Sequence, residues 1–522
     1  MGIYLNPSNI DFQQALNSKI YVDKSMLIEY ANNVIYTEQK FICVSRPRRF
    51  GKSMAANMLT AYYSCGCNSR EMFSHLKISE GESFEKHLNR YNLIHVNMVN
   101  FLSESQNIDE MIEFIEEDLI DELKNEYPDV RYPRRENLIK VIAAIFSQKN
   151  IPFIFIIDEW DCIFRVHKSY ENSQTKYLNF LRNLLKDQSY VALAYMTGIL
   201  PIKKYGEHSA INAFYEYSMI DAEPISEFTG FTENEVKDLC EKYNKSFSEM
   251  KRWYDGYNLN GISIYNPKSV VESILRGQFN NYWTSTETYE ALRVYIEMNF
   301  DGLKDTIIEL LAGQKAVIDT TTFSNDMVTL ETKDDVLTLL VHLGYLTYDF
   351  YTKEVSIPNY EISEQFASTI KVMGWSEVAN SLTLSDELLK ATLNGNEEKV
   401  AELIDKAHSD NTSILKYNDE NSLSCVISLA YYSARKTYTI ERELSAGKGF
   451  ADLVFRPRKN NSNPAMIVEL KYDKSAGGAL DQIKKRQYAD CLKDYSGEIL
   501  LVGINYNKND KRHTCKIEKV TK

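Results

Sequence analysis

Residues near the N-terminus have the types and spacing that phosphate binding requires. Residues 46–53 read RPRRFGKS and follow the apolar run from Phe41 to Val44, which is typical of a buried strand. A helical pattern begins at Lys52 and Ser53, so backbone N–H groups and the helix dipole would face an anion there. Lys52 can place a positive charge on the outer phosphates, and the Ser53 hydroxyl can reach Mg²⁺. The order of strand, loop, Gly-Lys-Ser and helix therefore predicts a phosphate-binding loop.

The loop departs from the common pattern G-x-x-x-x-G-K-[ST], because Arg46 stands where that pattern has its first glycine. The residues that follow are stiffer and more basic than usual, and a bulky side chain at position 46 could alter the loop geometry. The residues that we assign to nucleotide binding in this stretch are Arg46, Pro47, Arg48, Arg49, Phe50, Gly51, Lys52 and Ser53.

A pair of carboxylates follows a second apolar run. Residues 153–157 read FIFII, as expected for a strand buried on both faces of a parallel sheet, and Asp158 and Glu159 come directly after them. Asp158 would hold Mg²⁺ together with Ser53, and Glu159 would orient and polarise the attacking water as a catalytic residue. The alternative is a strand that ends in solvated acids, and the upstream Gly-Lys-Ser favours the catalytic interpretation.

The chain up to about residue 220 alternates between strand and helix patterns, which predicts a parallel sheet with helices on both faces. Ligands of such sheets bind at the carboxyl ends of the strands. Thr197 ends one strand and could sense the terminal phosphate, or it could simply begin a turn. Lys203, Lys204 and Arg182 are further candidate charges, and the sequence does not choose among them. Strands are expected at 41–44, 93–99, 153–157 and 192–196, and helices at 108–127 and 136–148.

The middle of the chain is mainly helical. A capped helix is expected to begin at Thr232, and residues 253–257, WYDGY, predict a packed corner. A helix at 334–343, followed by a short strand within 344–348, a charged turn and a strand within 354–359, outlines a winged helix. Such an element can read DNA or act as a structural lid, and the acidic surroundings favour the lid. Two helices at 386–393 and 397–407 then form a connector.

Near the C-terminus, three residues could form a second chemical site. A hairpin would bring Asp452, at the start of one strand, close to Glu469 and Lys471 on the next. Strand alternation places Glu469 and Lys471 on the same face. Two carboxylates beside a lysine can hold Mg²⁺ and activate water for attack on a phosphodiester. A chance occurrence of D…E-x-K is the alternative, because E-x-K alone is a weak signal.

Several of these motifs together resemble the bacterial AAA-ATPase-like family. They are residues 21–24 (YVDK), 46–53 (RPRRFGKS), 156–161 (IIDEWD), 197–200 (TGIL), 253–257 (WYDGY) and 265–267 (YNP). In that family an arginine at the first glycine position is usual. The resemblance implies ATP and Mg²⁺ as cofactors, and a C-terminal nuclease-like domain of the PD-(D/E)XK superfamily.

The C-terminal residues resemble the core of that nuclease superfamily. Residues 449–452, GFAD, match its G-x-x-D, and residues 469–471, ELK, match its E-x-K. The resemblance makes Asp452, Glu469 and Lys471 catalytic and adds Glu420 to the metal-binding residues Asp452 and Glu469. It also places Gln482 on the helix that follows the site. The proline that often precedes the aspartate is absent, which removes no chemistry.

The composition restricts the class of protein. The net charge of −13 argues against general coating of nucleic acid, yet residues 441–522 carry 17 Lys and Arg against 11 Asp and Glu. A basic C-terminal region can still meet a phosphate backbone. The eight cysteines are scattered, so we expect reduced thiols in a cytoplasmic protein, not disulfides or a zinc site. No apolar stretch is long enough to span a membrane, and no secretory signal is evident.

Together with the two family resemblances, these patterns predict an α/β protein with three regions. Residues 1–220 would form an AAA-type P-loop NTPase domain with a parallel sheet, and 221–382 a helical and winged-helix-like lid. Residues 383–522 would form connector helices and a restriction-endonuclease-like α/β domain. A homo-oligomer is left open, since proteins of the AAA type often form rings.

The preferred function is an ATPase coupled to a metal-dependent nuclease that acts on DNA or RNA, in defence or mobile-element biology. One alternative is a nucleotide-dependent binding switch whose nuclease-like domain holds nucleic acid or a protein without cutting. Another is a protein that binds nucleotide only structurally.

Overall fold

The computed structural model divides by internal contacts into two compact units, Met1–Glu287 with Val317–Ile362, and Thr288–Ala316 with Ser363–Lys522. The residues described are 2–166, 171–202, 212–283, 289–298, 300–323, 330–373, 375–411, 420–446, 449–458, 461–486, 488, 492 and 495–520.

The centre of the first unit is a five-stranded parallel sheet in the order β2-β3-β4-β1-β5. All residues of β1, β3 and β4 are buried, which explains their continuous apolar sequences. Because the strands are parallel, β1 ends on the same edge where β3 ends at Asp158 and β4 at Gly198. The loop of residues 46–51 that follows β1 is the predicted phosphate-binding loop, called the phosphate loop below. The strand bounds are β1 Phe41–Ser45, β2 Asn92–Asn97, β3 Phe153–Asp158, β4 Val191–Gly198 and β5 Tyr215–Tyr217.

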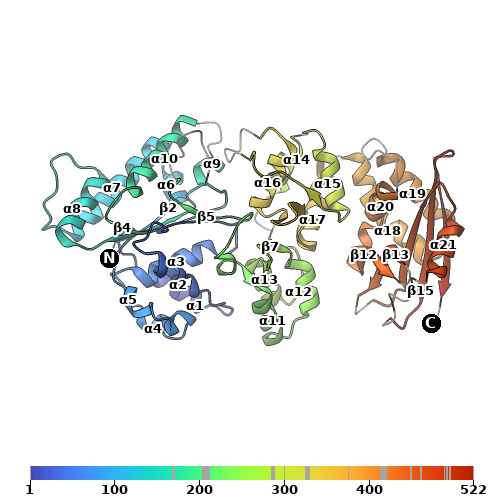
Figure 1. The fold of residues 1–522 in the computed structure, drawn as a ribbon, viewed down its shortest axis with the longest axis horizontal. Helices are drawn as coiled ribbons and strands as arrows, with labels where there is room; N and C mark the ends of the chain where they lie inside the picture. Colours follow the sequence, from blue (N-terminus) through green and yellow to red (C-terminus); the bar gives the residue numbers. More distant parts are fainter. Residues whose placement is uncertain are drawn as a thin grey trace. The chain divides into compact units, whose positions relative to one another are not determined.

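Helices cover both faces of this sheet (Figure 1), as the sequence predicts. One side carries α1 Ile10–Leu16, α2 Met26–Val34, α3 Lys52–Tyr63, α4 Arg70–Phe73 and α5 Phe84–His87, with a 3₁₀ turn, η1, at Lys77–Glu80. The other carries α6 Met98–Glu104, α7 Ile108–Glu126, α8 Leu138–Lys149, α9 Cys162–Val166 and α10 Glu171–Leu185.

Two details of the sequence prediction are wrong. The strand expected at 93–99 ends at Asn97, because the Asn97 side chain accepts a hydrogen bond from the Val99 N–H and caps helix α6. The helical pattern that begins at Lys52 places Met54 on one apolar face with Met58 and Leu59, but Met54 is 46% exposed and lines a cavity.

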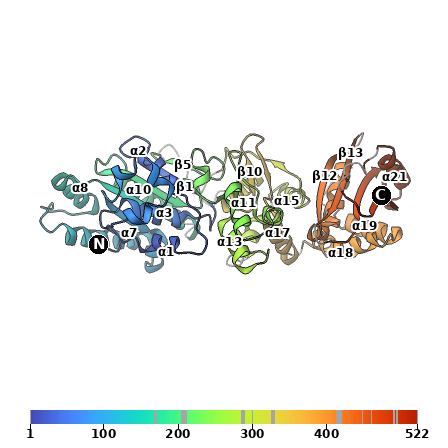
Figure 2. The ribbon, with the colours of Figure 1, turned by 90° about the horizontal axis from the view of Figure 1, so that it is seen from below.

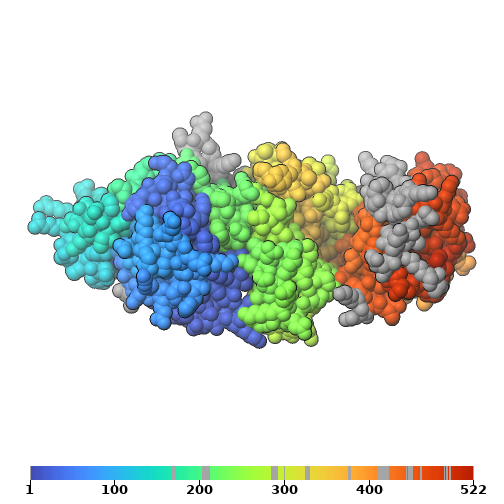
Figure 3. All heavy atoms as spheres, turned by 60° about the horizontal axis from the view of Figure 1, so that its bottom comes forward, coloured from blue at the N-terminus to red at the C-terminus, as the bar shows by residue number. Residues whose placement is uncertain are grey.

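The chain after the sheet folds into a small helical region of the same unit. The capping box predicted at Thr232 is present, with Glu235 as its partner. Residues of this region contact the N-terminal segment (Figure 3): Lys24 Nζ lies 2.6 Å from Glu235 Oε2, and the Tyr243 hydroxyl donates to the Lys19 carbonyl. The elements are η2 Ser226–Phe228, β6 Phe231–Thr232, α11 Glu233–Lys242, α12 Phe247–Tyr254, β7 Tyr257–Leu259, β8 Ile262–Tyr265 and α13 Pro267–Arg276.

The predicted packed corner lies between α12 and β7. The Tyr257 hydroxyl donates to the Gly344 carbonyl at 2.9 Å. Gly256 has φ +102°, and a Cβ there would lie 1.9 Å from the Pro358 carbonyl oxygen. This close approach requires glycine. The predicted winged-helix outline is also present, as α16 Lys333–Leu343, β10 Thr347–Asp349, β11 Glu354–Ser356 and the start of α17 Tyr360–Met373, with the short strand β9 Ala316–Val317 beside β11.

The second unit is built on a mixed sheet in the order β12-β13-β14-β15-β16. Only β14 and β15 pair in parallel. Helices α18, α19 and α20 pack on one face and α21 on the other (Figure 1 and Figure 2). The elements are α14 Tyr289–Ile296, α15 Leu303–Leu311, α18 Ser376–Leu393, α19 Glu397–Asn411, α20 Glu420–Ala430, η4 Tyr432–Lys436, β12 Tyr438–Ala446, β13 Gly449–Pro457, β14 Ala465–Tyr472, α21 Ala476–Lys485, β15 Ile499–Asn507 and β16 Arg512–Val520.

Among the described helices, none combines the length and the apolar character that crossing a membrane requires.

Candidate active sites

The phosphate loop wraps around the side chain of Lys52. The Lys52 ammonium donates to the carbonyls of Arg46 and Pro47 at 2.9 and 3.0 Å. Gly51 caps helix α3 with φ +88°, so the chain turns sharply into the helix. Burial lowers the pKa of Lys52, and the nearby charges of Glu159, Asp161 and Asp158 oppose that shift. The loop thus holds a buried cation at the start of a helix, where an anion is favoured.

Arg46 points away from this loop and into the protein core. Its Nε donates to Thr229 Oγ1 at 3.0 Å, and its Nη1 donates to the carbonyls of Tyr217 and Ser45 at 2.8 and 2.9 Å. Burial lowers the pKa of Arg46 to about 10. The side chain therefore shapes the loop from outside, and its backbone lies where the usual glycine would be.

Placing at position 46 the glycine of the common G-x-x-x-x-G-K-[ST] pattern is therefore expected to destabilise the folded protein. The change Arg46→Gly removes three hydrogen bonds and leaves a cavity, so the free energy of unfolding should fall by about 3 kcal/mol. The exposed neighbour is the control, because Arg48→Gly should cost about 1 kcal/mol or less. Urea denaturation followed by tryptophan fluorescence measures both values. Equal stability of wild type and Arg46→Gly would contradict this role of Arg46.

A buried carboxylate supports the other side of the loop. Arg49 Nη1 donates to the carbonyls of Tyr282 and Trp283 at 2.9 and 2.6 Å. The N–H groups of these same two residues donate to Glu361 Oε1 at 2.6 and 2.8 Å, and the Ser269 hydroxyl also donates to this carboxylate. Glu361 lies in the first turn of α17 and is 1% exposed. The loop conformation is thus fixed by residues that lie more than two hundred positions away.

Glu361 should make stability depend on pH. Burial raises the pKa of its carboxyl from 4.5 to about 7, against the opposing effect of its hydrogen bonds. The protonated carboxyl is favoured in the fold, so this contribution is fully present below pH 4.5 and is lost as the pH rises through about 7. The loss amounts to about 3 kcal/mol.

The variant Glu361→Gln keeps the shape and stays neutral, so it should gain stability relative to wild type between pH 5 and pH 8. Tryptophan fluorescence in urea follows this unit, which contains three of the four tryptophans, Trp160, Trp253 and Trp283. The control is Glu241→Gln, which changes an exposed side chain. Parallel pH profiles of wild type and Glu361→Gln would refute the prediction.

The predicted acidic pair lies at the end of β3. Asp158 is 2% exposed and accepts hydrogen bonds from the Thr197 hydroxyl, from Asn97 Nδ2 at 3.4 Å and from the Glu159 N–H at 3.0 Å. Thr197 therefore lies beside the acidic pair, as the sequence suggested. Glu159 has φ +55°, a left-handed conformation that costs a residue with a side chain about 1 kcal/mol or more. Its carboxylate pairs with Arg165.

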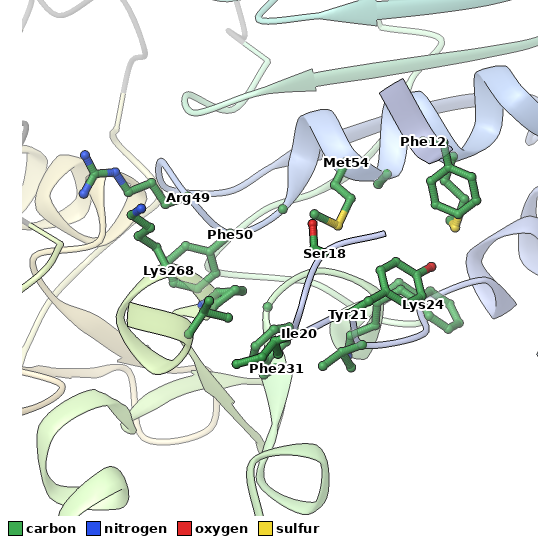
Figure 4. Close-up of a pocket in the computed structure, with 18 of the residues that line it drawn as sticks. Phe12, Ser18, Ile20, Tyr21, Lys24, Arg49, Phe50, Met54, Phe231 and Lys268 are labelled. Atoms are coloured by element: carbon green, nitrogen blue, oxygen red, sulfur yellow. The ribbon is translucent and has the colours of Figure 1, made fainter. Parts of the chain in front are cut away.

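Two cavities adjoin the phosphate loop. The first, of about 560 Å³, is lined by Lys52, Ser53, Glu159 and Arg165 among others. The second, of about 610 Å³, is mainly apolar and lies between the N-terminal segment, α3 and the helical region, as Figure 4 shows with Tyr21, Met54 and Phe231. Arg49, Gly51 and Met54 line both cavities, so the two spaces adjoin at the loop.

Sequence reasoning missed Asn97 and Arg165, and no pattern in the sequence marks either residue. The other candidate charges gain no support. Arg182 is exposed on α10 and does not line the cavity at Lys52 and Ser53. Lys203 and Lys204 lie outside the described residues.

In the second unit, the predicted hairpin of β13 and β14 brings the three chemical residues together. Lys471 Nζ lies 2.9 Å from Glu469 Oε1, and the Leu470 N–H donates to Asp452 Oδ2 at 2.6 Å. Gln482 of α21 donates through Nε2 to Glu469 Oε1 and, at 3.3 Å, to the Tyr488 hydroxyl. Glu469 is 1% exposed and Lys471 is 8% exposed. The site is therefore a compact cluster against α21, in which Glu469 and Lys471 are buried and Asp452 is partly exposed.

The donor set fits a cation. Burial and the charge of Asp452 raise the pKa of Glu469 to about 7, which a bound cation would reverse. Glu469 Oε2 is buried without a hydrogen-bond partner among the described residues, so it remains available as a ligand. Glu420 begins α20, but its side chain lies outside the described part. The described residues alone contain no group of three or more possible metal ligands.

Comparisons with known proteins agree with this layout. Residues 10–206 match the family described as predicted AAA-ATPase, and residues 418–516 match the PD-(D/E)XK nuclease superfamily. An uncharacterised protein in the vnfD 5′ region of Azotobacter chroococcum mcd 1 is 21% identical over 532 residues, which cover 94% of this chain and 93% of that protein.

Similar solved structures include Cdc6p from Pyrobaculum aerophilum, at 11% identity and a TM-score of 0.23, over 70% of this chain and 93% of that one. AMPPCP-bound DnaA from Aquifex aeolicus has 10% identity and a TM-score of 0.25, over 81% of this chain and 97% of its own. The family models themselves assign residues 10–206 to the predicted AAA-ATPase family and residues 418–516 to the PD-(D/E)XK nuclease superfamily, and these two matches are what the chain shares with known families.

Proposed function

We propose that this protein is a nucleotide-dependent nuclease, in which ATP bound at the phosphate loop controls cleavage of DNA or RNA by the C-terminal site. The observation that carries the proposal is the cluster of Asp452, Glu469 and Lys471, in which Glu469 and Lys471 are buried and Asp452 is partly exposed. A lysine 2.9 Å from one carboxylate, with a second carboxylate hydrogen-bonded to the same strand, suits phosphodiester hydrolysis better than it suits a structural ion pair.

The two adjoining cavities suggest how ATP would bind. The phosphates would occupy the cavity at Lys52 and Ser53, where the helix start and the ammonium face them. The base and ribose would enter the apolar cavity beside Tyr21 and Phe231. Ser53 and Asp158 would hold Mg²⁺, which supplies charge neutralisation to the outer phosphates. Glu159 would then orient the water that attacks the terminal phosphorus.

At the C-terminal site the division of labour follows from the contacts. Asp452 and Glu469 would hold Mg²⁺, which supplies Lewis-acid polarisation of the phosphate. Lys471 would position the attacking water or stabilise the negative charge that develops on the phosphate oxygens. Gln482 holds the Glu469 carboxylate from α21. Water would attack phosphorus and give up a proton, the bond to the leaving sugar oxygen would break, and that oxygen would take up a proton.

Control by nucleotide rests on the contacts of the phosphate loop. Arg49 joins the loop to the backbone at Trp283, and Glu361 joins that backbone to the first turn of α17. Helix α17 continues along the chain from Ile362 of the first unit to Ser363 of the second. A change in the loop on nucleotide binding would therefore bias this helix. Such control suits defence against foreign nucleic acid or mobile-element biology in a bacterial cytoplasm.

The test is a cleavage assay on single- and double-stranded DNA and RNA, with Mg²⁺ or Mn²⁺ and with or without ATP. Wild type is compared with Asp452→Asn, which keeps the shape and removes the charge. Cleavage by wild type alone is the expected result. No cleavage of any substrate, together with intact nucleic-acid binding, would overturn the proposal in favour of a binding switch.

A further inference from the structure

Arg165 lies between two carboxylates, that of Glu159, the proposed catalytic residue, and that of the buried Asp161. Its Nη2 donates to Glu159 Oε2, and its Nε lies 3.1 Å from Asp161 Oδ2. The side chains of Arg165 and Glu159 are 14% and 20% exposed, whereas that of Asp161 is fully buried. The guanidinium therefore lies between a partly accessible carboxylate and an inaccessible one.

Asp161 is held firmly. Its Oδ2 accepts the N–H groups of Ile199 and Leu200, at 3.1 and 2.8 Å, just after β4 ends. The backbone of Trp160 donates to the Thr197 carbonyl at 3.0 Å, so the segment from 158 to 161 is tied to β4. Of its two partners, Arg165 can therefore exchange Glu159 far more easily than Asp161.

The pairing keeps Glu159 from catalysis. A carboxylate that accepts a hydrogen bond from a guanidinium has less capacity to accept a proton or a hydrogen bond from water. Arg165, Glu159 and Lys52 line the same cavity, so a terminal phosphate that reaches Lys52 also comes into the field of Arg165. A phosphate presents more negative charge than a carboxylate and matches the guanidinium fork as well.

We propose that Arg165 is a switching residue of the ATPase site, an assignment that rests on the proposed function. Without a terminal phosphate it pairs with Glu159 and restrains it. When the phosphate arrives, Arg165 keeps Asp161, exchanges Glu159 for a phosphate oxygen and frees Glu159 to orient water. Glu159 is therefore released only when a terminal phosphate is bound, and with ADP it stays paired with Arg165.

Binding measurements on the full chain test the exchange, with ADP and AMPPCP as the two probes. Arg165→Ala should weaken AMPPCP about tenfold and leave ADP within about twofold, because only the terminal phosphate gains the contact. Arg165→Lys keeps the charge and should recover part of the loss. The control is Arg70→Ala, which removes an exposed ion pair with Glu85 and should change neither affinity. Circular dichroism checks that each variant folds.

A double-mutant cycle separates the exchange from simple repulsion. Glu159→Gln should tighten AMPPCP about fivefold in wild type, because no ion pair needs to break. In the Arg165→Ala background the same change should have almost no effect. Single-turnover hydrolysis should fall about a hundredfold in Arg165→Ala.

Equal loss of ADP and AMPPCP affinity in Arg165→Ala, unchanged affinity for both, or faster hydrolysis would overturn the exchange while leaving the ATPase intact. A Glu159→Gln effect of the same size in both backgrounds would also overturn it. If wild type binds neither nucleotide, the proposed ATPase itself fails, which is a different result.

Discussion

Replacing Lys471 by alanine should reduce cleavage of nucleic acid about a thousandfold while binding of the substrate changes little. The ammonium lies 2.9 Å from Glu469 Oε1, and both side chains are buried, so alanine leaves no positive charge at this place. Its contribution is expected mainly in the transition state, when negative charge on the phosphate increases. The loss should therefore appear in the cleavage rate at saturating protein.

The matched control is Lys484→Ala. Lys484 lies on α21, two residues from Gln482, but its side chain is 48% exposed and pairs with Glu518. This variant should cut at the wild-type rate within about twofold, since exposed pairs contribute little. Equal rates for wild type and Lys471→Ala would show that cleavage occurs at another site. The cluster of Asp452, Glu469 and Lys471 would then have no catalytic role.

Replacing Lys52 by alanine should weaken ATP binding about a hundredfold, or by about 2.7 kcal/mol. The lysine is 4% exposed and is held by two loop carbonyls, so it is already placed where phosphates would enter. Hydrolysis should fall below detection, because the remaining cavity lacks the charge that balances the outer phosphates. Equilibrium binding of a fluorescent ATP analogue measures the first effect, and phosphate release measures the second.

The control for this prediction is Lys124→Ala. Lys124 lies on α7 and forms an exposed ion pair with Glu136, so its loss should leave ATP binding unchanged. Retained ATP affinity in Lys52→Ala, with the protein folded, would mean that the loop does not bind phosphate. The cavity at Lys52 would then need another explanation.

Local sequence predicted much of both sites. The apolar runs of β1 and β3 and the Gly-Lys-Ser at the start of α3 are contiguous signals, so they identify the helix start at Lys52 and the strand end at Asp158. Alternation along β14 likewise predicted that Glu469 and Lys471 share a face. Hairpin pairing with β13 follows from short connections, and it brings Asp452 to the same place.

The remaining features depend on contacts between residues far apart in sequence. The side chain of Arg46 turns inward because Thr229 and the Tyr217 carbonyl are there to receive it. Glu361 is linked to the phosphate loop indirectly, because it accepts hydrogen bonds from the backbone of residues 282 and 283, whose carbonyls accept from Arg49. Nothing in the sequence near Arg165 indicates its pairing, because an arginine on a short helix has no periodic signal. The division of residues 288–316 into the second unit is equally invisible locally.

The most direct test of the account is the single-turnover cleavage rate of one labelled nucleic acid with ATP, with ADP and without nucleotide. We predict that ATP changes the wild-type rate by about tenfold and that Lys52→Ala shows no such change. A wild-type rate that is the same under all three conditions, with cleavage still abolished in Lys471→Ala, would contradict nucleotide control and leave a nuclease that works independently of its phosphate loop.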